Sequence, residues 1–237
     1  MIIGDGMIAK AMEEIDSQSI IFFCSGVSNS QETSEKAFKR EKDLLTTIIK
    51  KRKVYNLMRS GSSSSKMRKL IYFGSIDFYI KQSPYYYHKK SMERLVETYP
   101  HHLIIRAPQA VGPKGNRCNL TNFLANSILK EQPIKLYEAF RSLLDVADLR
   151  EIVDYLISIG RSGEIDINYV ELITVAEIVS ILENALSKAA TIKKPKMQYS
   201  KFLDIRYNTQ EVQTILDELG IRKSGYNKKV IEKYYGN

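Results

Sequence analysis

The sequence predicts an α/β fold, with a doubly wound, mostly parallel sheet followed by a small C-terminal α/β lobe. The continuous apolar run IIFFC at 20–24 is typical of a strand buried on both faces, and LIYFGS at 70–75 and HLIIRAP at 102–108 are two further candidates for buried strands. Segments with helical spacing separate these runs, and this alternation favours a doubly wound sheet whose ligands bind beyond the carboxyl ends of the strands. The 237 residues, 43% of them apolar, suffice for one large domain or for a domain with a smaller lobe.

The first expected element is a very short N-terminal strand, which a glycine turn joins to a helix. In MIIGDGMIAKAMEEI the pattern G-x-G-x-x-A begins at Gly4, and apolar residues at helical spacing follow it. Glycine lets the chain turn tightly and lets a pyrophosphate approach the backbone at the helix N-terminus. A plain strand–turn–helix is the alternative. The candidate cofactor-binding residues are Gly4, Asp5, Gly6, Met7 and Ile8, together with Ser25 after the next strand.

A long helix is expected at about 32–52, after the strand at 20–24. Apolar residues recur there at helical spacing among dense charge, at Ala37, Leu44, Leu45, Ile48 and Ile49. This helix should pack on the sheet. The stretch RSGSSSSK that follows, at 59–66, has the composition of a flexible loop.

The next expected helix contains tyrosine and lysine four residues apart in two overlapping registers. In SPYYYHKKSMERLV, residues 83–96, Tyr85 pairs with Lys89 and Tyr86 with Lys90. With 15 tyrosines in a lysine-rich chain, such pairs also arise by chance, so the spacing alone is a weak signal. A tyrosine hydroxyl titrates at about pH 10 when unperturbed, and a lysine one helical turn away can favour its phenolate. The segment is either an acid–base pair or a tyrosine-rich helix that packs at a subunit contact.

Order and spacing together resemble the extended short-chain dehydrogenases/reductases that act on nucleotide sugars. The stretch SPYYYHKKSMERLV is similar to the family's S-P-Y-x-x-x-K-x-x-x-E-x-L-V helix, with Glu93 four residues after Lys89, so the resemblance selects Tyr85 and Lys89. LIYFGSIDFY resembles the family's strand ending in S-S-x-x-x-Y, with Ser75 in the place of the catalytic Ser or Thr and Gly74 in the place of the other serine. IIRAPQAVGP at 104–113 and RSLLDVADL at 141–149 resemble the segments L-R-x-x-x-V-Y-G-P and R-x-x-x-x-V-x-D.

This resemblance implies Ser75, Tyr85 and Lys89 as catalytic residues and a nicotinamide cofactor, NAD or NADP. Ser75 would position the substrate oxygen, Tyr85 would give or take a proton as hydride moves, and Lys89 would also hold the nicotinamide ribose. The implied partner is a nucleotide-diphosphate sugar, with Asn119 and Arg141 at positions that face it. The implied activity is that of an oxidoreductase or epimerase, and most specifically of a 4-keto-sugar reductase in the synthesis of surface polysaccharide precursors.

The resemblance also implies how the chain is divided. Residues 1–110 would form a Rossmann-like NAD(P)-binding domain to which 136–158 return, and residues 111–135 and 159–237 would form the substrate lobe. Within the lobe, helices are expected at 119–133, at 174–188 after a capping box of Thr174 and Glu177, and at 209–221. A homodimer is expected through the helices at 32–52 and 84–99, which in relatives pack against their symmetry mates as a four-helix bundle.

One departure from the family concerns the adenosine side of the cofactor site. Relatives have a strand, a helix and a further strand before the strand that here is IIFFC, whereas Ile15 to Ile20 leaves room only for a short turn. In relatives this strand–helix–strand unit carries the residue that binds the adenosine ribose, so the choice between NAD and NADP stays open. Lys10 is a candidate contact for a 2′-phosphate, with a solvated helix lysine as the alternative. A non-catalytic binding or scaffold protein that has lost cofactor binding is therefore the alternative function.

Composition limits the partners, the location and the metal content that we expect. The formal charge of +9 suggests an anionic partner, but the basic clusters at 50–53, 66–69 and 193–196 are typical of solvated helix ends and loops, so we do not expect nucleic acid. The apolar runs are too short to span a membrane and the N-terminus lacks the layout of a signal peptide, so a cytoplasmic protein is expected. Cys24 and Cys118 have neither metal-binding nor disulfide spacing, so we expect both thiols to be reduced and no metal to be bound.

Overall fold

The computed structural model describes residues 1–58, 67–79, 82–113, 117–136, 139–168, 170–193, 208–221 and 224–236. The stretch expected to be a flexible loop, 59–66, lies outside the described residues. The chain divides into two compact units, one of residues 1–106 with 156–165 and one of residues 107–155 with 166–237.

The first unit contains a five-stranded sheet, as expected for a Rossmann-like α/β fold. Its strands are β1 (Ile2–Ile3), β2 (Ile20–Phe23), β3 (Lys69–Ser75), β4 (His102–Ala107) and β8 (Gly163–Asp166), in the order β1-β2-β3-β4-β8. The pairs β1–β2 and β2–β3 are parallel. All four residues of β2 are buried, which agrees with the continuous apolar run that predicted this strand.

The first strand lies at one end of this sheet. It leads through α1 (Met7–Ala11), the 3₁₀ helix η1 (Met12–Ile15) and a turn directly to β2, which is its neighbour in the sheet. Within the described residues no further strand pairs with β1. The sheet therefore has the reduced strand number that the sequence predicts.

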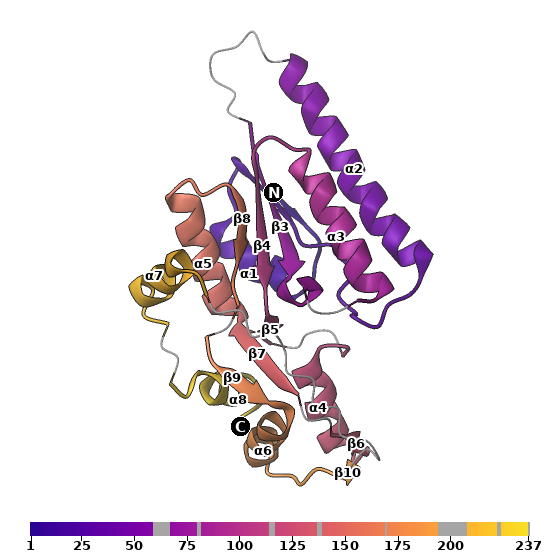
Figure 1. Ribbon diagram of the computed structural model, residues 1–237, viewed down its shortest axis with the longest axis vertical. Coiled ribbons are helices and arrows are strands. Elements are labelled where there is room, and N and C mark those ends of the chain that lie inside the picture. The colour runs from indigo at the N-terminus through magenta and orange to yellow at the C-terminus, as the bar shows by residue number, and fades with distance from the viewer. Residues whose placement is uncertain are drawn as a thin grey trace. The chain divides into compact units, whose positions relative to one another are not determined.

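Two helices, α2 (Glu35–Met58) and α3 (Pro84–Glu97), cover one face of the sheet (Figure 1). The core between these helices and the sheet consists of Ile21, Phe23, Leu45, Ile49, Leu70, Tyr72, Met92, Val96, Tyr99 and Ile104. A short 3₁₀ helix, η2 (Ile76–Tyr79), follows β3. This packing fixes α2 and α3 against the sheet, and along the chain each helix follows a strand, β2 or β3, at whose carboxyl end candidate site residues were predicted.

The second unit has its own small sheets and helices. Strand β7 (Phe140–Asp145) lies between β5 (Gln109–Val111) and β9 (Leu172–Thr174), and β6 (Ile134–Lys135) pairs with β10 (Ile192–Lys193). Because β7 belongs to this separate sheet, residues 136–155 do not return to the first unit, and the returning segment is 156–165. The functional division expected from the sequence, with boundaries at 110 and 136–158, stays a prediction.

Five helices of the described chain have residues in the second unit. They are α4 (Leu120–Leu129), α5 (Val146–Ser158), α6 (Val175–Leu186), α7 (Gln210–Glu218) and α8 (Tyr226–Tyr235), and the last residues of α5 belong to the first unit. The capping box expected before α6 is present, because the Thr174 side chain accepts from the Glu177 N–H while the Glu177 carboxylate accepts from the Thr174 N–H. No helix in the described part of the chain is long and apolar enough to cross a membrane.

Candidate functional site

The glycine turn after β1 is exposed and lies against the end of β2. Gly4 has φ of +121°, and a Cβ atom there would lie 2.7 Å from the Cys24 carbonyl oxygen and 3.0 Å from the Ser25 nitrogen, so a side chain is excluded. Gly6 is the N-cap residue of α1, and a Cβ atom there would meet nothing within 4 Å. The turn therefore brings Gly4 and Ser25 together and leaves open space beside Gly6.

This turn fits one end of a dinucleotide. The exposed backbone of Gly4, Asp5 and Gly6 offers a pyrophosphate the close approach that the pattern predicts, while Met7 and Ile8 are half-buried in α1. On the other side, the described chain has no strand beyond β1 to carry a residue for the adenosine ribose. The residues present therefore fit the phosphates of a dinucleotide. Among the described residues, no strand beyond β1 supplies a contact to the adenosine ribose.

The tyrosine–lysine helix, α3, begins with Pro84 at its first position, where a missing N–H costs nothing. Tyr85 and Tyr86 are both buried, with ring centroids 4.9 Å apart in an edge-to-face arrangement. Lys89 is 4% exposed and its Nζ lies 5.8 Å from the centre of the Tyr85 ring, whereas Lys90 is exposed. This arrangement favours Tyr85 with Lys89 over the alternative register.

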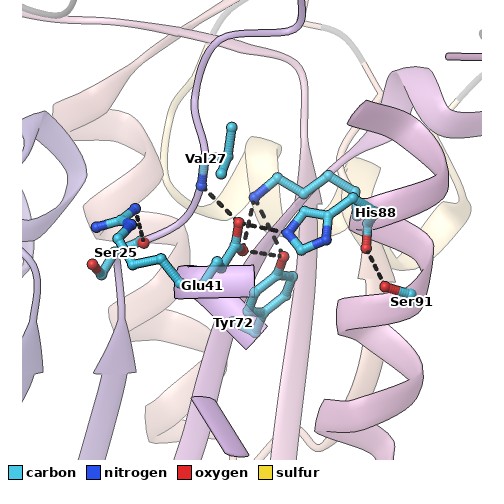
Figure 2. Close-up of polar contacts among 8 residues, drawn as sticks. Ser25, Val27, Glu41, Tyr72, His88 and Ser91 are labelled. Carbon is cyan, nitrogen blue, oxygen red and sulfur yellow. Dashed lines mark hydrogen bonds and ion pairs between the residues drawn. The ribbon is translucent and has the colours of Figure 1, made fainter. Parts of the chain in front are cut away.

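Glu41 of α2 lies in a buried polar cluster with Tyr72 and His88 (Figure 2). Lys89 belongs to the same cluster. The Glu41 Oε2 atom accepts from the Val27 N–H at 2.7 Å and lies 2.9 Å from His88 Nε2. The Glu41 Oε1 atom accepts from the Tyr72 hydroxyl at 3.1 Å and from Lys89 Nζ at 3.3 Å. Lys89 Nζ also donates to the Tyr72 hydroxyl, at 3.3 Å. We call Glu41, Tyr72, His88 and Lys89 the Glu41 cluster.

The charges of the Glu41 cluster affect the neighbouring Tyr85, and the direction of its pKa shift differs from the one expected from the sequence. Burial opposes ionisation of Glu41, but its hydrogen bonds to His88 and Val27 and the Lys89 charge hold the pKa of its carboxyl at about 2. Burial, with the Glu41 and Asp77 carboxylates, raises the pKa of the Tyr85 hydroxyl above its usual value. We expected Lys89 to favour the Tyr85 phenolate, whereas in this structure burial and the two carboxylates favour the protonated hydroxyl.

The same contacts bear on whether Lys89 fits as a ligand for the nicotinamide ribose. A Cβ atom at Gly26 would lie 2.7 Å from Lys89 Nζ and 3.1 Å from Glu41 Oε1, so the backbone after β2 closes directly over the ion pair. In this arrangement the ammonium is covered and already paired. The role of ribose ligand, which the resemblance implies for Lys89, stays a prediction.

Ser75 is the last residue of β3, as predicted, and it is half-buried. The departure at Gly74 has a steric explanation, because a Cβ atom there would collide with Glu93 Oε1 and lie 3.3 Å from Arg106 Cγ. Arg106 Nε donates to Glu93 Oε2 at 2.9 Å, and its Nη1 donates to the Tyr79 hydroxyl at 2.9 Å. Glycine at position 74 thus leaves room for the buried ion pair between Glu93 of α3 and Arg106 of β4. Both residues lie in segments that carry the resemblance.

The two predicted substrate residues lie in the second unit. Asn119 donates to the Ala110 carbonyl at 2.7 Å and accepts from the Gln109 side chain, so its amide ties the start of α4 to β5. Arg141 is half-buried on β7 and donates to the Phe140 carbonyl at 2.7 Å. Of the neighbouring basic residues, Arg117 is exposed and Lys114 lies outside the described residues.

Sequence reasoning missed Glu41, Tyr72 and His88. A signal for Glu41 was present, since it lies four and eight residues before the buried Leu45 and Ile49 and so occupies the core-facing stripe of α2. A charged residue on that stripe indicates a buried partner. Nothing in the sequence indicates that the partners lie 31 to 48 residues away.

The fold and these residues define a class: a Rossmann-like sheet with a buried tyrosine–lysine pair on the helix beside it. Solved structures confirm the resemblance in fold. UDP-glucuronic acid 4-epimerase from Bacillus cereus in complex with NAD matches with a TM-score of 0.68 at 16% identity, over 98% of this chain and 84% of that one. UDP-glucose 4-epimerase from Thermus thermophilus in complex with NAD matches with a TM-score of 0.65 at 15% identity, over 95% and 78%.

A third structure shares the fold, and sequence comparison adds nothing to these matches. RMD from Pseudomonas aeruginosa, complexed with NADPH, has a TM-score of 0.62 at 15% identity, over 90% of this chain and 79% of that chain. No family model and no curated protein matches the sequence. At this identity, the matches show that the chain has the fold of nucleotide-sugar epimerases.

Proposed function

We propose that this protein is an NAD- or NADP-dependent oxidoreductase or epimerase of nucleotide-diphosphate sugars. The observation that carries the proposal is the buried Tyr85–Lys89 pair on α3, beside the carboxyl end of β3, in a chain that has the fold of solved nucleotide-sugar epimerases. Within this class, the specific activity we propose is reduction of a 4-keto sugar.

The chain's own residues would act on the substrate oxygen. Tyr85 would donate or accept the proton at that oxygen, and the Ser75 hydroxyl would hold the oxygen in place by a hydrogen bond. Such acid–base help is typically worth about 100- to 10,000-fold in rate. A bound nicotinamide would supply or take up the hydride, and its pyrophosphate would be held at the turn formed by Gly4 and Gly6.

Turnover by variants of the two neighbouring tyrosines tests the proposal. Wild-type protein is incubated with NADH or NADPH and a panel of 4-keto nucleotide sugars, and nicotinamide absorbance and sugar products are followed. Tyr85→Phe should fold normally and lose at least about 100-fold in turnover, while Tyr86→Phe, the matched control, should retain it. Full activity in Tyr85→Phe with loss in Tyr86→Phe would show that the proposed register is wrong.

Substrate recognition is proposed to involve Arg141, since the planar guanidinium fork suits a diphosphate. The Arg141→Ala variant should bind nucleotide sugars roughly ten- to a hundredfold more weakly, because a charge-assisted contact is worth about 1.5–3 kcal/mol. NAD(P)H affinity should stay nearly unchanged. A thermal-shift screen of nucleotide diphosphates and nucleotide sugars measures this, and identical responses of variant and wild type would make Arg141 structural.

A second candidate function is a non-catalytic binding protein that has kept the fold. The covered ion pair between Lys89 and Glu41 and the position of β1 at the end of the sheet favour it. Under this alternative the wild-type protein binds neither NADH nor NADPH at millimolar concentration. Turnover of any nucleotide sugar by the wild type, lost in Tyr85→Phe, would exclude it.

A further inference from the structure

The charge of Lys89 is enclosed among protein groups. Its Nζ lies 3.3 Å from both Glu41 Oε1 and the Tyr72 hydroxyl, and 5.4 Å from the centre of the Tyr72 ring. The backbone at Gly26 covers the pair, and the Lys89 residue is 4% exposed. A charge held in this way acts on its immediate neighbours and is little screened by water.

Glu41 is built to stay ionised. It has no exposed surface, and its two oxygens accept from a backbone N–H, an imidazole, a phenol and an ammonium group. A buried carboxylate with this many donors keeps its negative charge. Glu41 and Lys89 together therefore form a pair without net charge beside Tyr85.

The groups around Tyr85 come from four elements. Glu41 lies on α2, Tyr72 on β3 and Asp77 on η2, while α3 itself contributes Tyr86, His88 and Lys89. The carboxylates of Glu41 and Asp77 act on Tyr85 electrostatically, the Lys89 ammonium lies 5.8 Å from the centre of its ring, and His88 donates to Glu41. This balance of charge does not favour a phenolate.

We propose that Glu41 is a positioning residue, which closes Lys89 into a neutral ion pair and so keeps Tyr85 in the protonated form that donates a proton. This proposal rests on the proposed function and narrows it. A protonated Tyr85 suits reduction of a substrate carbonyl, because that direction needs a proton donor. The tyrosine O–H bond breaks as an O–H bond forms on the substrate oxygen, and the negative charge stays on the phenolate. The hydride for that reduction would come from a reduced nicotinamide.

The test follows ionisation of Tyr85 directly, without cofactor, by NMR of isotope-labelled tyrosine with the resonance assigned through Tyr85→Phe. In wild-type protein, Tyr85 should stay protonated to at least about pH 9. In Glu41→Gln its midpoint should fall by about one pH unit or more, because Lys89 is then unbalanced. Glu41→Asp, which keeps a carboxylate, should behave like the wild type.

The matched control is Asp43→Asn on the same helix. Asp43 is exposed and pairs with Lys39 at 3.3 Å, so its loss should leave Tyr85 unchanged. Equal midpoints in Glu41→Gln and Asp43→Asn would overturn the proposal, as would ionisation of wild-type Tyr85 below about pH 9. If Glu41→Gln does not fold, the pH titration of Tyr85 in the wild-type protein decides alone. Titration of the same wild-type sample with NADH and NADPH tests the proposed function separately, since Tyr85 ionisation is measured without either.

Discussion

Glu41 is a single carboxylate on which four hydrogen-bond donors converge, and its removal leaves Lys89 buried without its carboxylate partner. We expect Glu41→Ala to lower the free energy of unfolding by about 3–5 kcal/mol, the usual cost of breaking a buried ion pair. Asp43→Ala, on the exposed face of the same helix, should change it by less than about 0.5 kcal/mol. Urea unfolding of the two variants measures the difference, and equal effects would show that the Glu41 cluster contributes little stability.

Stability at acid pH depends on the same carboxylate. Its pKa is about 2 in the folded protein against an ordinary value of 4.5, so the folded state holds its proton less tightly than the unfolded state. The resulting stability, roughly 3 kcal/mol, is therefore present above about pH 4.5 and is lost as the pH falls toward 2. Urea midpoints measured across this range should fall more steeply for the wild type than for Glu41→Gln. Parallel curves would contradict this assignment.

At the scale of elements, strands and helices were predictable where one local pattern decides them. Strand β2 follows a continuous apolar run, β3 and β4 lie at the predicted strand segments, and α6 begins at the predicted capping box. The pairing of β7 with β5 and β9 was not predictable from its own residues, because strand partners are chosen by contacts distant in sequence. The Tyr85–Lys89 pair was identifiable from spacing and resemblance. The pairing of the Lys89 charge with Glu41 was not, because it depends on how α2 packs against α3.

The C-terminal helix α8 is fixed within the second unit by tyrosine hydroxyl groups. The Tyr226 hydroxyl donates to Asp148 Oδ2 at 2.6 Å and accepts from the Asp145 N–H at 2.9 Å, and Tyr235 donates to Asn122 Oδ1 at 2.6 Å. Tyr226→Phe leaves the Asp145 N–H without its acceptor, which should cost about 1–3 kcal/mol. Tyr87→Phe is the control, since Tyr87 is 62% exposed. Thermal unfolding compares them, and a Tyr226→Phe variant as stable as the control would contradict this role.

At the scale of the whole molecule, a homodimer through α2 and α3 remains a prediction. Both helices pack their apolar positions on the sheet, and Tyr87 is a large exposed side chain on the outer side of α3. Light scattering at tens of micromolar should give twice the mass of the 27.2 kDa chain. A charged substitution, Tyr87→Glu, should shift the equilibrium toward the monomer, and a monomeric wild type would refute the prediction.

Cofactor binding tests the central claim, that this fold serves nicotinamide chemistry, most directly. Wild-type protein and Gly6→Ala are titrated with NADH and NADPH while nicotinamide fluorescence is followed. Because a Cβ atom at Gly6 meets no protein atom within 4 Å, the variant should fold and melt like the wild type, yet its methyl group would occupy the space proposed for the pyrophosphate. We predict saturable binding of at least one cofactor by the wild type and binding weaker by roughly tenfold or more in Gly6→Ala. Absence of binding by the wild type at millimolar concentration of either cofactor would contradict the claim.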